Sequence, residues 1–168
     1  MGMIANYQYI NDEQLKSLKN FNAEDDEVFE AVEDWNEEAE ILCDLDKMWD
    51  VLHFVLTGHA SDDSIKGNPL SEAVVGVSSL DDVEEFIAYT EKSKIADIVS
   101  ALDGFDIEKA MENFSMKECK KAKLYPDIWD YEEETDDIKD DLMNCFQNMK
   151  AFYKEVLEAT GNVMVTIY

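Results

Sequence analysis

Residues 45–58 of the chain read LDKMWDVLHFVLTG, and this stretch decides the fold. At about 100° per residue its apolar side chains fall within one arc of roughly 160°, as in a helix that buries one face. The apolar set is Leu45, Met48, Trp49, Val51, Leu52, Val55 and Leu56. Asp44 or Asp46 can cap the start of this helix, and Gly58 stands where a left-handed residue ends one. We therefore expect a helix at the centre of the core.

Extended segments are expected at both ends of the chain. Residues 3–10, MIANYQYI, are rich in β-branched and aromatic types, and residues 163–168, VMVTIY, are apolar almost throughout. Between them, the apolar residues of 138–157 recur at three and four positions over about six turns, which predicts a long helix. Two terminal strands in a mostly helical chain can pair in one small sheet. We therefore predict a single α+β domain over residues 1–168, mostly helical, with a small sheet that includes the N- and C-terminal strands.

Shorter elements are expected between these segments. Cap residues followed by helix-forming sequence predict helices that begin at Asn11, Thr90, Asp106 and Ser115. A further helix is predicted over 24–34, where acids lead an apolar stripe. Residues 59–69 are typical of a loop, and 86–89 of extended chain. Residues 38–45 and 70–77 each fit either a helix or a strand.

Acidic side chains dominate the charge of the chain. Its 168 residues include 14 Lys and Arg against 40 Asp and Glu, so the formal net charge is −26. A chain this negative repels nucleic-acid phosphates and anionic membranes at long range, so we expect neither as a partner. No segment approaches the ~18 uninterrupted apolar residues of a membrane span, and the N-terminus lacks the features of a signal peptide. We expect a cytoplasmic protein whose charge serves a basic partner or solubility alone.

Cofactor and metal motifs are absent from the sequence. The glycines form neither of the usual phosphate-binding patterns, and His59 with Asp62 and Asp63 lacks the spacing of a calcium loop. We interpret these acids as solvated and expect no cofactor. The three cysteines show no C-x-x-C spacing and are predicted to be buried, reduced thiols, at Cys43, Cys119 and Cys145.

His53 is the candidate general base. It follows Trp49 by one turn and Asp50 by three residues, so an imidazole between an aromatic ring and a carboxylate is geometrically available. The favoured interpretation is a core-edge histidine that Asp50 or a backbone carbonyl satisfies, because the sequence places no nucleophile beside it. Cys43 could supply a thiol, but ten residues of chain do not fix its distance from His53 and no thiol-hydrolase signature surrounds it.

Residues 125–131, YPDIWDY, place three aromatic rings among acids. Aromatic rings with carboxylates at the rim suit a cationic group or a basic protein surface. The alternative is that the larger rings pack into the core, as most do. The candidate binding residues of the whole chain are Trp49, His53, Tyr125, Asp127, Trp129 and Asp130.

Several stretches taken together resemble the YfbM-like family of small bacterial proteins. They are MGMIANYQYI at the start, LDKMWDVLHFVLTG, PLSEAVVG at 69–76, YPDIW at 125–129 and FYKEVLEATGNVMVTIY at the end. The resemblance implies a bacterial, soluble, single-domain α+β protein with no settled biochemical role and no catalytic residues to carry over. Many relatives have a turn bearing glycine, tyrosine and proline before the helix that follows Thr90, whereas this chain has SSLDDVEEFIAYT at 78–90.

Three functions are compatible with these observations. The favoured one is a non-enzymatic protein-interaction module whose acidic surface holds a basic partner, in the manner of an immunity or antidote protein that blocks a cationic toxin. The second is a small hydrolase or transferase with His53 as general base in a pocket walled by Trp49 and Trp129. The third is an accessory domain with no ligand, whose charge serves solubility.

Overall fold

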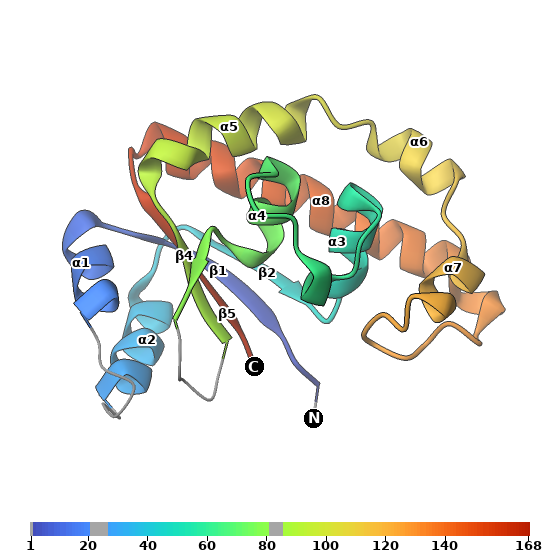
Figure 1. Cartoon of the computed structure of the whole chain (residues 1–168), viewed down its shortest axis with the longest axis horizontal. Helices are drawn as coiled ribbons and strands as arrows, with labels where there is room; N and C mark the ends of the chain where they lie inside the picture. Colours follow the sequence, from blue (N-terminus) through green and yellow to red (C-terminus); the bar gives the residue numbers. More distant parts are fainter. Residues whose placement is uncertain (1, 21–26, 81–85) are drawn as a thin grey trace.

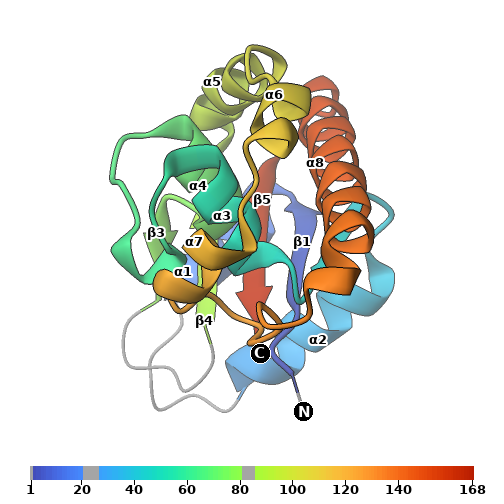
Figure 2. The ribbon, with the colours of Figure 1, turned by 90° about the vertical axis from the view of Figure 1, so that its right-hand side faces the viewer.

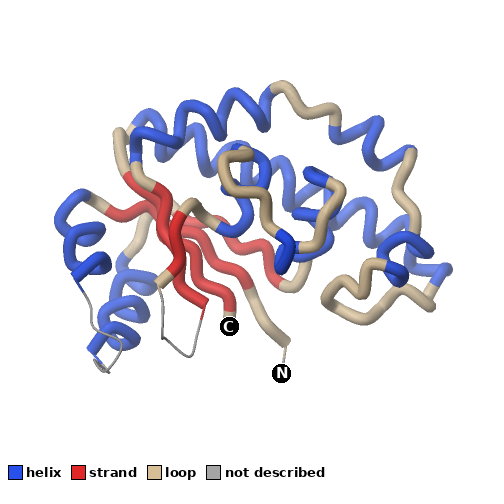
Figure 3. The backbone as a smooth tube through the Cα atoms, viewed as in Figure 1, coloured by secondary structure: helices blue, strands red, loops and turns tan. Residues whose placement is uncertain are grey.

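A five-stranded antiparallel sheet with helices on both faces forms the framework of the molecule (Figure 1). The computed structural model describes residues 2–20, 27–80 and 86–168. Figure 3 separates the sheet from the helices that surround it, and Figure 2 shows the long C-terminal helix running along one side. The strand order is β2-β1-β5-β4-β3. The strands are β1 Ala5–Ile10, β2 Leu42–Asp46, β3 Ser78–Ser79, β4 Phe86–Thr90 and β5 Asn162–Ile167.

The two terminal strands pair with each other at the centre of the sheet, which confirms the predicted α+β architecture. β1 runs antiparallel to β5 from Ala5 opposite Ile167 to Ile10 opposite Asn162. Beyond the strands, the Ile4 amide donates to the carbonyl of Tyr168 at 2.9 Å. Both chain ends therefore lie side by side at one edge of the molecule (Figure 1).

Side chains alternate between the two faces of the sheet. Tyr7, Val165 and Ala88 lie in register on three adjacent strands and face the larger core. Gln8 and Met164, each next to one of these residues in the chain, face the opposite side. Because helices cover both faces, β5 is buried along its whole length. This explains why its sequence is apolar almost throughout.

The larger core lies between the sheet and most of the helices. These are α3 Trp49–Thr57, α4 Pro69–Val75, α5 Lys92–Asp103, α6 Ile107–Glu112, α7 Met116–Lys121 and α8 Thr135–Glu158. The predicted apolar stripe of α8 is confirmed, since its buried residues recur at helical spacing from Ile138 to Val156. A smaller core on the other face of the sheet involves α1 Asp12–Asn20 and α2 Glu27–Glu38 (Figure 1).

The stretch 45–58 is divided between a strand and a helix. The prediction of a helix from Leu45 is wrong, because Leu45 belongs to β2 and the helix begins at Trp49 without a side-chain cap. The Asp44 carboxylate instead accepts a hydrogen bond from the Asp46 amide at 2.7 Å in the turn that ends the strand. The end of the helix is as predicted, since Gly58 has a left-handed backbone with φ of 79°.

The helix after β4 is capped from a neighbouring strand. Thr90 was predicted as its N-cap, but this is wrong because Thr90 is the buried last residue of β4. The amide of Lys92 donates to Oδ1 of Asn162, at the start of β5, at 2.8 Å. A residue distant in sequence therefore supplies the acceptor that a local cap would have supplied.

The other predicted caps are confirmed. Asn11 and Gln14 exchange side-chain-to-amide hydrogen bonds at the start of α1, and Asp106 and Ser115 cap α6 and α7. Of the two undecided segments, 38–45 leads into strand β2 and 70–77 is mainly helix α4. The expected loop over 59–69 includes a short 3-10 turn, Ser61–Asp63. The predicted helix 24–34 corresponds to α2, and its first three residues lie outside the described residues.

Candidate functional site

The first turn of α3 holds the N-terminal segment of the chain against an aromatic pair. The rings of Trp49 and Tyr125 stack with centroids 5.6 Å apart and planes 25° apart. Trp49 Nε1 donates to the Met3 carbonyl at 3.1 Å, and the Met3 amide donates to the Tyr125 hydroxyl at 2.7 Å. Two of the predicted binding residues, Trp49 and Tyr125, are therefore neighbours in space.

Asp50 ties two loops to the same helix turn. One of its carboxylate oxygens accepts hydrogen bonds from the Ser61 amide at 2.9 Å and the Ser61 hydroxyl at 2.8 Å. The other accepts from the Tyr125 amide at 2.8 Å. A buried carboxylate costs free energy unless its oxygens are hydrogen-bonded, and here three donors satisfy it. The sequence-based pairing of Asp50 with His53 is replaced by these contacts.

An apolar groove opens beside Trp49, with a volume of about 440 Å³. Three of the large apolar side chains that are exposed in the described chain border it: Met3 is 44% exposed, Phe86 37% and Tyr168 36%. We call it the Trp49 groove, and its lining is Met3, Trp49, Ser61, Asp62, Val75, Phe86, Ile167 and Tyr168. Among the lining residues that the structure describes, Asp62 is the one that carries a charge, and none of them is cationic. The groove can therefore accept an apolar group whose surroundings are positively charged.

His53 is fully buried and connects α3 to two other segments. Its Nδ1 lies 2.7 Å from the His59 carbonyl, which can only accept, so Nδ1 carries the proton. Nε2 then accepts from the Ser71 hydroxyl at 2.8 Å, and the Ser71 oxygen accepts from the Ile65 amide at 3.0 Å. Burial lowers the pKa of His53, although the His59 carbonyl and the Asp50 carboxylate act in the opposite direction. A backbone carbonyl satisfies the imidazole, as the favoured interpretation expected.

The lowered pKa of His53 predicts that its contribution to stability decreases in acid. As pH falls below the ordinary value of 6.5, the unfolded chain takes up a proton before the folded protein does, so the free energy of unfolding falls. A His53→Gln variant has no imidazole at this position, so its free energy of unfolding does not fall in acid for this reason. Asp50, His59 and Asp63 are present in both proteins, so their own titration contributes to both. The stability difference between the two proteins is expected to shrink between about pH 7.5 and about pH 5. Urea denaturation measures it, and a constant difference would contradict the assignment.

The remaining predicted binding residues lie apart from the Trp49 groove. Trp129 is buried in the core, where its Nε1 donates to the Leu124 carbonyl at 3.0 Å and its ring meets that of Phe114 edge-on. Asp127 and Asp130 are exposed, and Asp130 forms an ion pair with Lys120. The structure thus brings together Trp49 and Tyr125 but not the complete predicted set.

The cysteines are free thiols in apolar surroundings. Cys43 and Cys119 are buried as predicted and Cys145 is half-buried. Burial raises the pKa of Cys43 and of Cys119 to about 12 and that of Cys145 to about 11, which disfavours the thiolate.

His59 pairs with Asp63 at 2.9 Å on the surface. Within the described residues, no three His, Cys, Asp or Glu side chains are grouped to hold a metal ion.

Sequence reasoning missed the residues at the mouth of the Trp49 groove and the partner of His53. Met3, Phe86 and Tyr168 look like ordinary strand-end residues in the sequence, and nothing local distinguishes them. Ser71 is one of many serines, eighteen positions after His53. Only the pairing of the strands and the docking of α4 bring these residues to their places.

Among the helices that the structure describes, none is long and apolar enough to cross a membrane.

Comparison with known proteins identifies one family over nearly the whole chain. Residues 1–166 match the model of a domain of unknown function designated DUF1877. Protein YfbM of Escherichia coli (strain K12) is 29% identical over 168 residues, covering 99% of this chain and 98% of that protein. The crystal structure of YfbM from Escherichia coli, described as a protein of unknown function, has a TM-score of 0.80 at 27% identity, covering 98% of this chain and 99% of that one. The resemblance noted in the sequence is therefore confirmed, and the chain belongs to the DUF1877 family.

Proposed function

We propose that the protein is a cytoplasmic, non-enzymatic interaction module that binds a basic protein segment at the Trp49 groove. The observation that carries this proposal is the gathering of exposed apolar side chains around one groove, on a chain with a net charge of −26. The partner segment would place a large apolar side chain in the groove and lysines or arginines around it. An immunity or antidote protein that blocks a cationic toxin would work in this way.

Charge and apolar contact contribute differently to such a complex. Opposite net charges speed the encounter and disfavour acidic competitors, while most of the affinity comes from a few apolar anchors that are desolvated in a pocket. The Trp49 groove offers a pocket for such an apolar anchor. Trp49 and Ile167 form its buried wall, and Phe86 and Tyr168 form its exposed mouth. Asp62 at the rim favours a cationic flank.

A pentapeptide with phenylalanine between two pairs of lysines tests the proposal. We expect it to bind with an affinity that falls as salt rises, and to bind at least about tenfold more tightly than the same peptide with glycine in the centre. Isothermal titration calorimetry measures both effects. In the protein, Phe86→Ser is expected to weaken binding by about tenfold, because it removes one wall of the mouth.

Leu42→Ser is the matched control for Phe86→Ser. Leu42 is also an exposed apolar residue on a strand, at 51% exposure, but it lies on β2 and outside the groove. Equal effects of the two substitutions would contradict the proposal, as would equal binding of the glycine peptide. Absence of any peptide binding would favour the accessory domain that has no ligand.

The alternative function, a hydrolase or transferase, is supported by the hydrogen bond between Ser71 and His53. The serine hydroxyl donates to Nε2, which is the direction in which a base activates a nucleophile. Ser71 also borders a second hollow of about 320 Å³. The Ser71 side chain is only 1% exposed, however, and its oxygen already accepts from the Ile65 amide. These contacts favour a structural role for the pair.

A further inference from the structure

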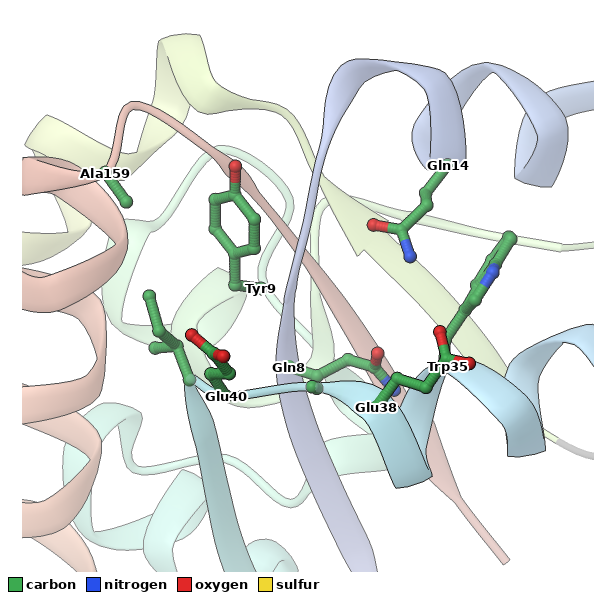
Figure 4. Close-up of a pocket in the computed structure, with 9 residues that line it drawn as sticks. Gln8, Tyr9, Gln14, Trp35, Glu38, Glu40 and Ala159 are labelled. Atoms are coloured by element: carbon green, nitrogen blue, oxygen red, sulfur yellow. The ribbon is translucent and has the colours of Figure 1, made fainter.

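A further pocket, distinct from the hollow beside Ser71, lies next to Gln8 and Tyr9 in the second half of β1 (Figure 4). The Trp49 groove lies near the other end of that strand, where Ile167 pairs with Ala5. β2 pairs with β1 only as far as Gln8, and beyond this point the Tyr9 amide donates to the Ile41 carbonyl at 3.1 Å. The end of α2, the start of α1 and the end of α8 close the space, whose volume is about 400 Å³. We call it the Gln8 pocket, and it shares no lining residue with the Trp49 groove.

One buried polar atom in this pocket has no hydrogen-bond partner among the residues that the structure describes. The Gln8 side chain is 1% exposed, and its Nε2 donates to Oδ1 of Asn36 on α2. Its Oε1 accepts no hydrogen bond from any described residue. Figure 4 shows the Gln8 amide reaching into the space between Gln14 and Glu38. Because a buried acceptor without a donor is costly, a ligand that carries an N–H group would remove that cost.

The charged residues among the described lining are Glu38 and Glu40, and none of the described lining residues is a lysine, arginine or histidine. Neither glutamate forms an ion pair with a described residue. Trp35 supplies an aromatic ring on the same face of the sheet as Gln8, whereas Tyr9 borders the pocket from the opposite face. The Tyr9 ring packs directly over Gly161, where a Cβ atom would overlap it, so the ring is held in place. On the side of β1 that Gln8 faces, the pocket therefore offers an acceptor, negative charge and an aromatic ring together.

We propose that the Gln8 pocket binds a primary ammonium or guanidinium group carried on a short apolar chain. One N–H of the ligand donates to Gln8 Oε1, Glu38 and Glu40 attract its charge, and the Trp35 ring contacts its apolar chain. This site is separate from the proposed protein-binding function. The same chemistry could come from a small free amine or from a lysine or arginine side chain, and the experiment below distinguishes the two.

The indole N–H signals of the full-length protein report on the two sites separately in NMR spectra. The chain has three tryptophans, of which Trp35 lines the Gln8 pocket and Trp49 the groove. Titration with n-butylammonium or butylguanidinium is expected to shift the Trp35 signal saturably and to leave the Trp49 signal in place. Trimethylbutylammonium has the same charge without an N–H, and we expect it to bind at least about fivefold more weakly. Butyrate is expected not to bind.

A further titration, with a pentapeptide that has one central lysine, tests whether the cationic group belongs to a free amine or to a protein side chain. Tighter binding of the peptide than of butylammonium assigns the site to a protein side chain, and the reverse assigns it to a free amine. Either result supports the shared chemistry. A Trp35 signal that no cation moves, or that butyrate moves equally, would overturn the proposal while leaving the Trp49 groove untested by that result.

Substitutions in the lining provide the second test. The double change Glu38→Gln with Glu40→Gln is expected to weaken butylammonium binding about tenfold, because it removes the attracting charge. Glu37→Gln is the matched control, since Glu37 is exposed on the same helix but does not line the pocket. Gln8→Leu is expected to abolish the preference over trimethylbutylammonium. If Gln8→Leu fails to fold, the glutamate variants test the proposal. It is overturned if the double variant and Glu37→Gln bind butylammonium equally well.

Discussion

Replacing His53 by alanine is expected to lower the free energy of unfolding by about 2–4 kcal/mol. The imidazole is fully buried and links α3 to the His59 carbonyl and to the Ser71 hydroxyl, which in turn receives the Ile65 amide. Its removal leaves a cavity and takes a hydrogen-bond partner from both the carbonyl and the hydroxyl. Urea denaturation followed by circular dichroism measures the loss.

His59→Ala is the control for this prediction. The His59 side chain is 49% exposed and, among the described residues, its ion-pair partner is Asp63 on the surface, so we expect its removal to change stability by less than about 0.5 kcal/mol. Ser71→Ala, which breaks the same buried link from its other end, is expected to destabilise by about 1–3 kcal/mol. If His53→Ala instead kept full stability and abolished the turnover of some substrate, His53 would be a general base and the enzymatic alternative would hold.

The parts of the fold that could be predicted from the sequence are those whose signals are local. The apolar stripe of α8 repeats over many turns, and the strand character of β5 follows from the almost continuous apolar run of 163–168. Gly58 and the caps at Asp106 and Ser115 were also predicted, because a cap depends on the conformation and hydrogen bonds of a few neighbouring residues. Periodicity and capping therefore describe most of the helices.

The errors arose where a distant residue decides a local structure. Leu45 carries the helical pattern of the residues after it, but pairing of β2 with β1 draws it into the sheet. Thr90 is a suitable N-cap by type, but pairing with Val163 keeps it in β4 and leaves Asn162 to cap the helix. No pattern within one segment contains this information, because it depends on which strands become neighbours.

The same limit applies to the candidate sites. Tyr125 could be selected from the sequence because three aromatic rings among acids are unusual, and Trp49 because it lies one helical turn before His53. Phe86 reaches the Trp49 groove because it lies opposite Ile167 in the sheet, and the pairing of that strand with β1 brings Met3 to the other side. Gln8 likewise looks like one polar residue in a strand until α2 covers its face of the sheet. Register and layer packing, rather than residue type, create both pockets.

Replacing Trp49 by alanine is expected to lower the free energy of unfolding by about 3–5 kcal/mol. The change removes a buried ring that stacks on Tyr125, and it leaves the Met3 carbonyl without its indole donor. Trp49→Phe keeps an aromatic ring but not the N–H, so its expected loss is about 1–2 kcal/mol. Equal losses for the two variants would show that the hydrogen bond, rather than the ring, holds the N-terminal segment.

Trp49 belongs to both the core and the groove. Weaker peptide binding by Trp49→Ala could therefore result either from partial unfolding or from the lost contact with the peptide. The exposed residue Phe86, which borders the groove without this buried role, separates the two effects.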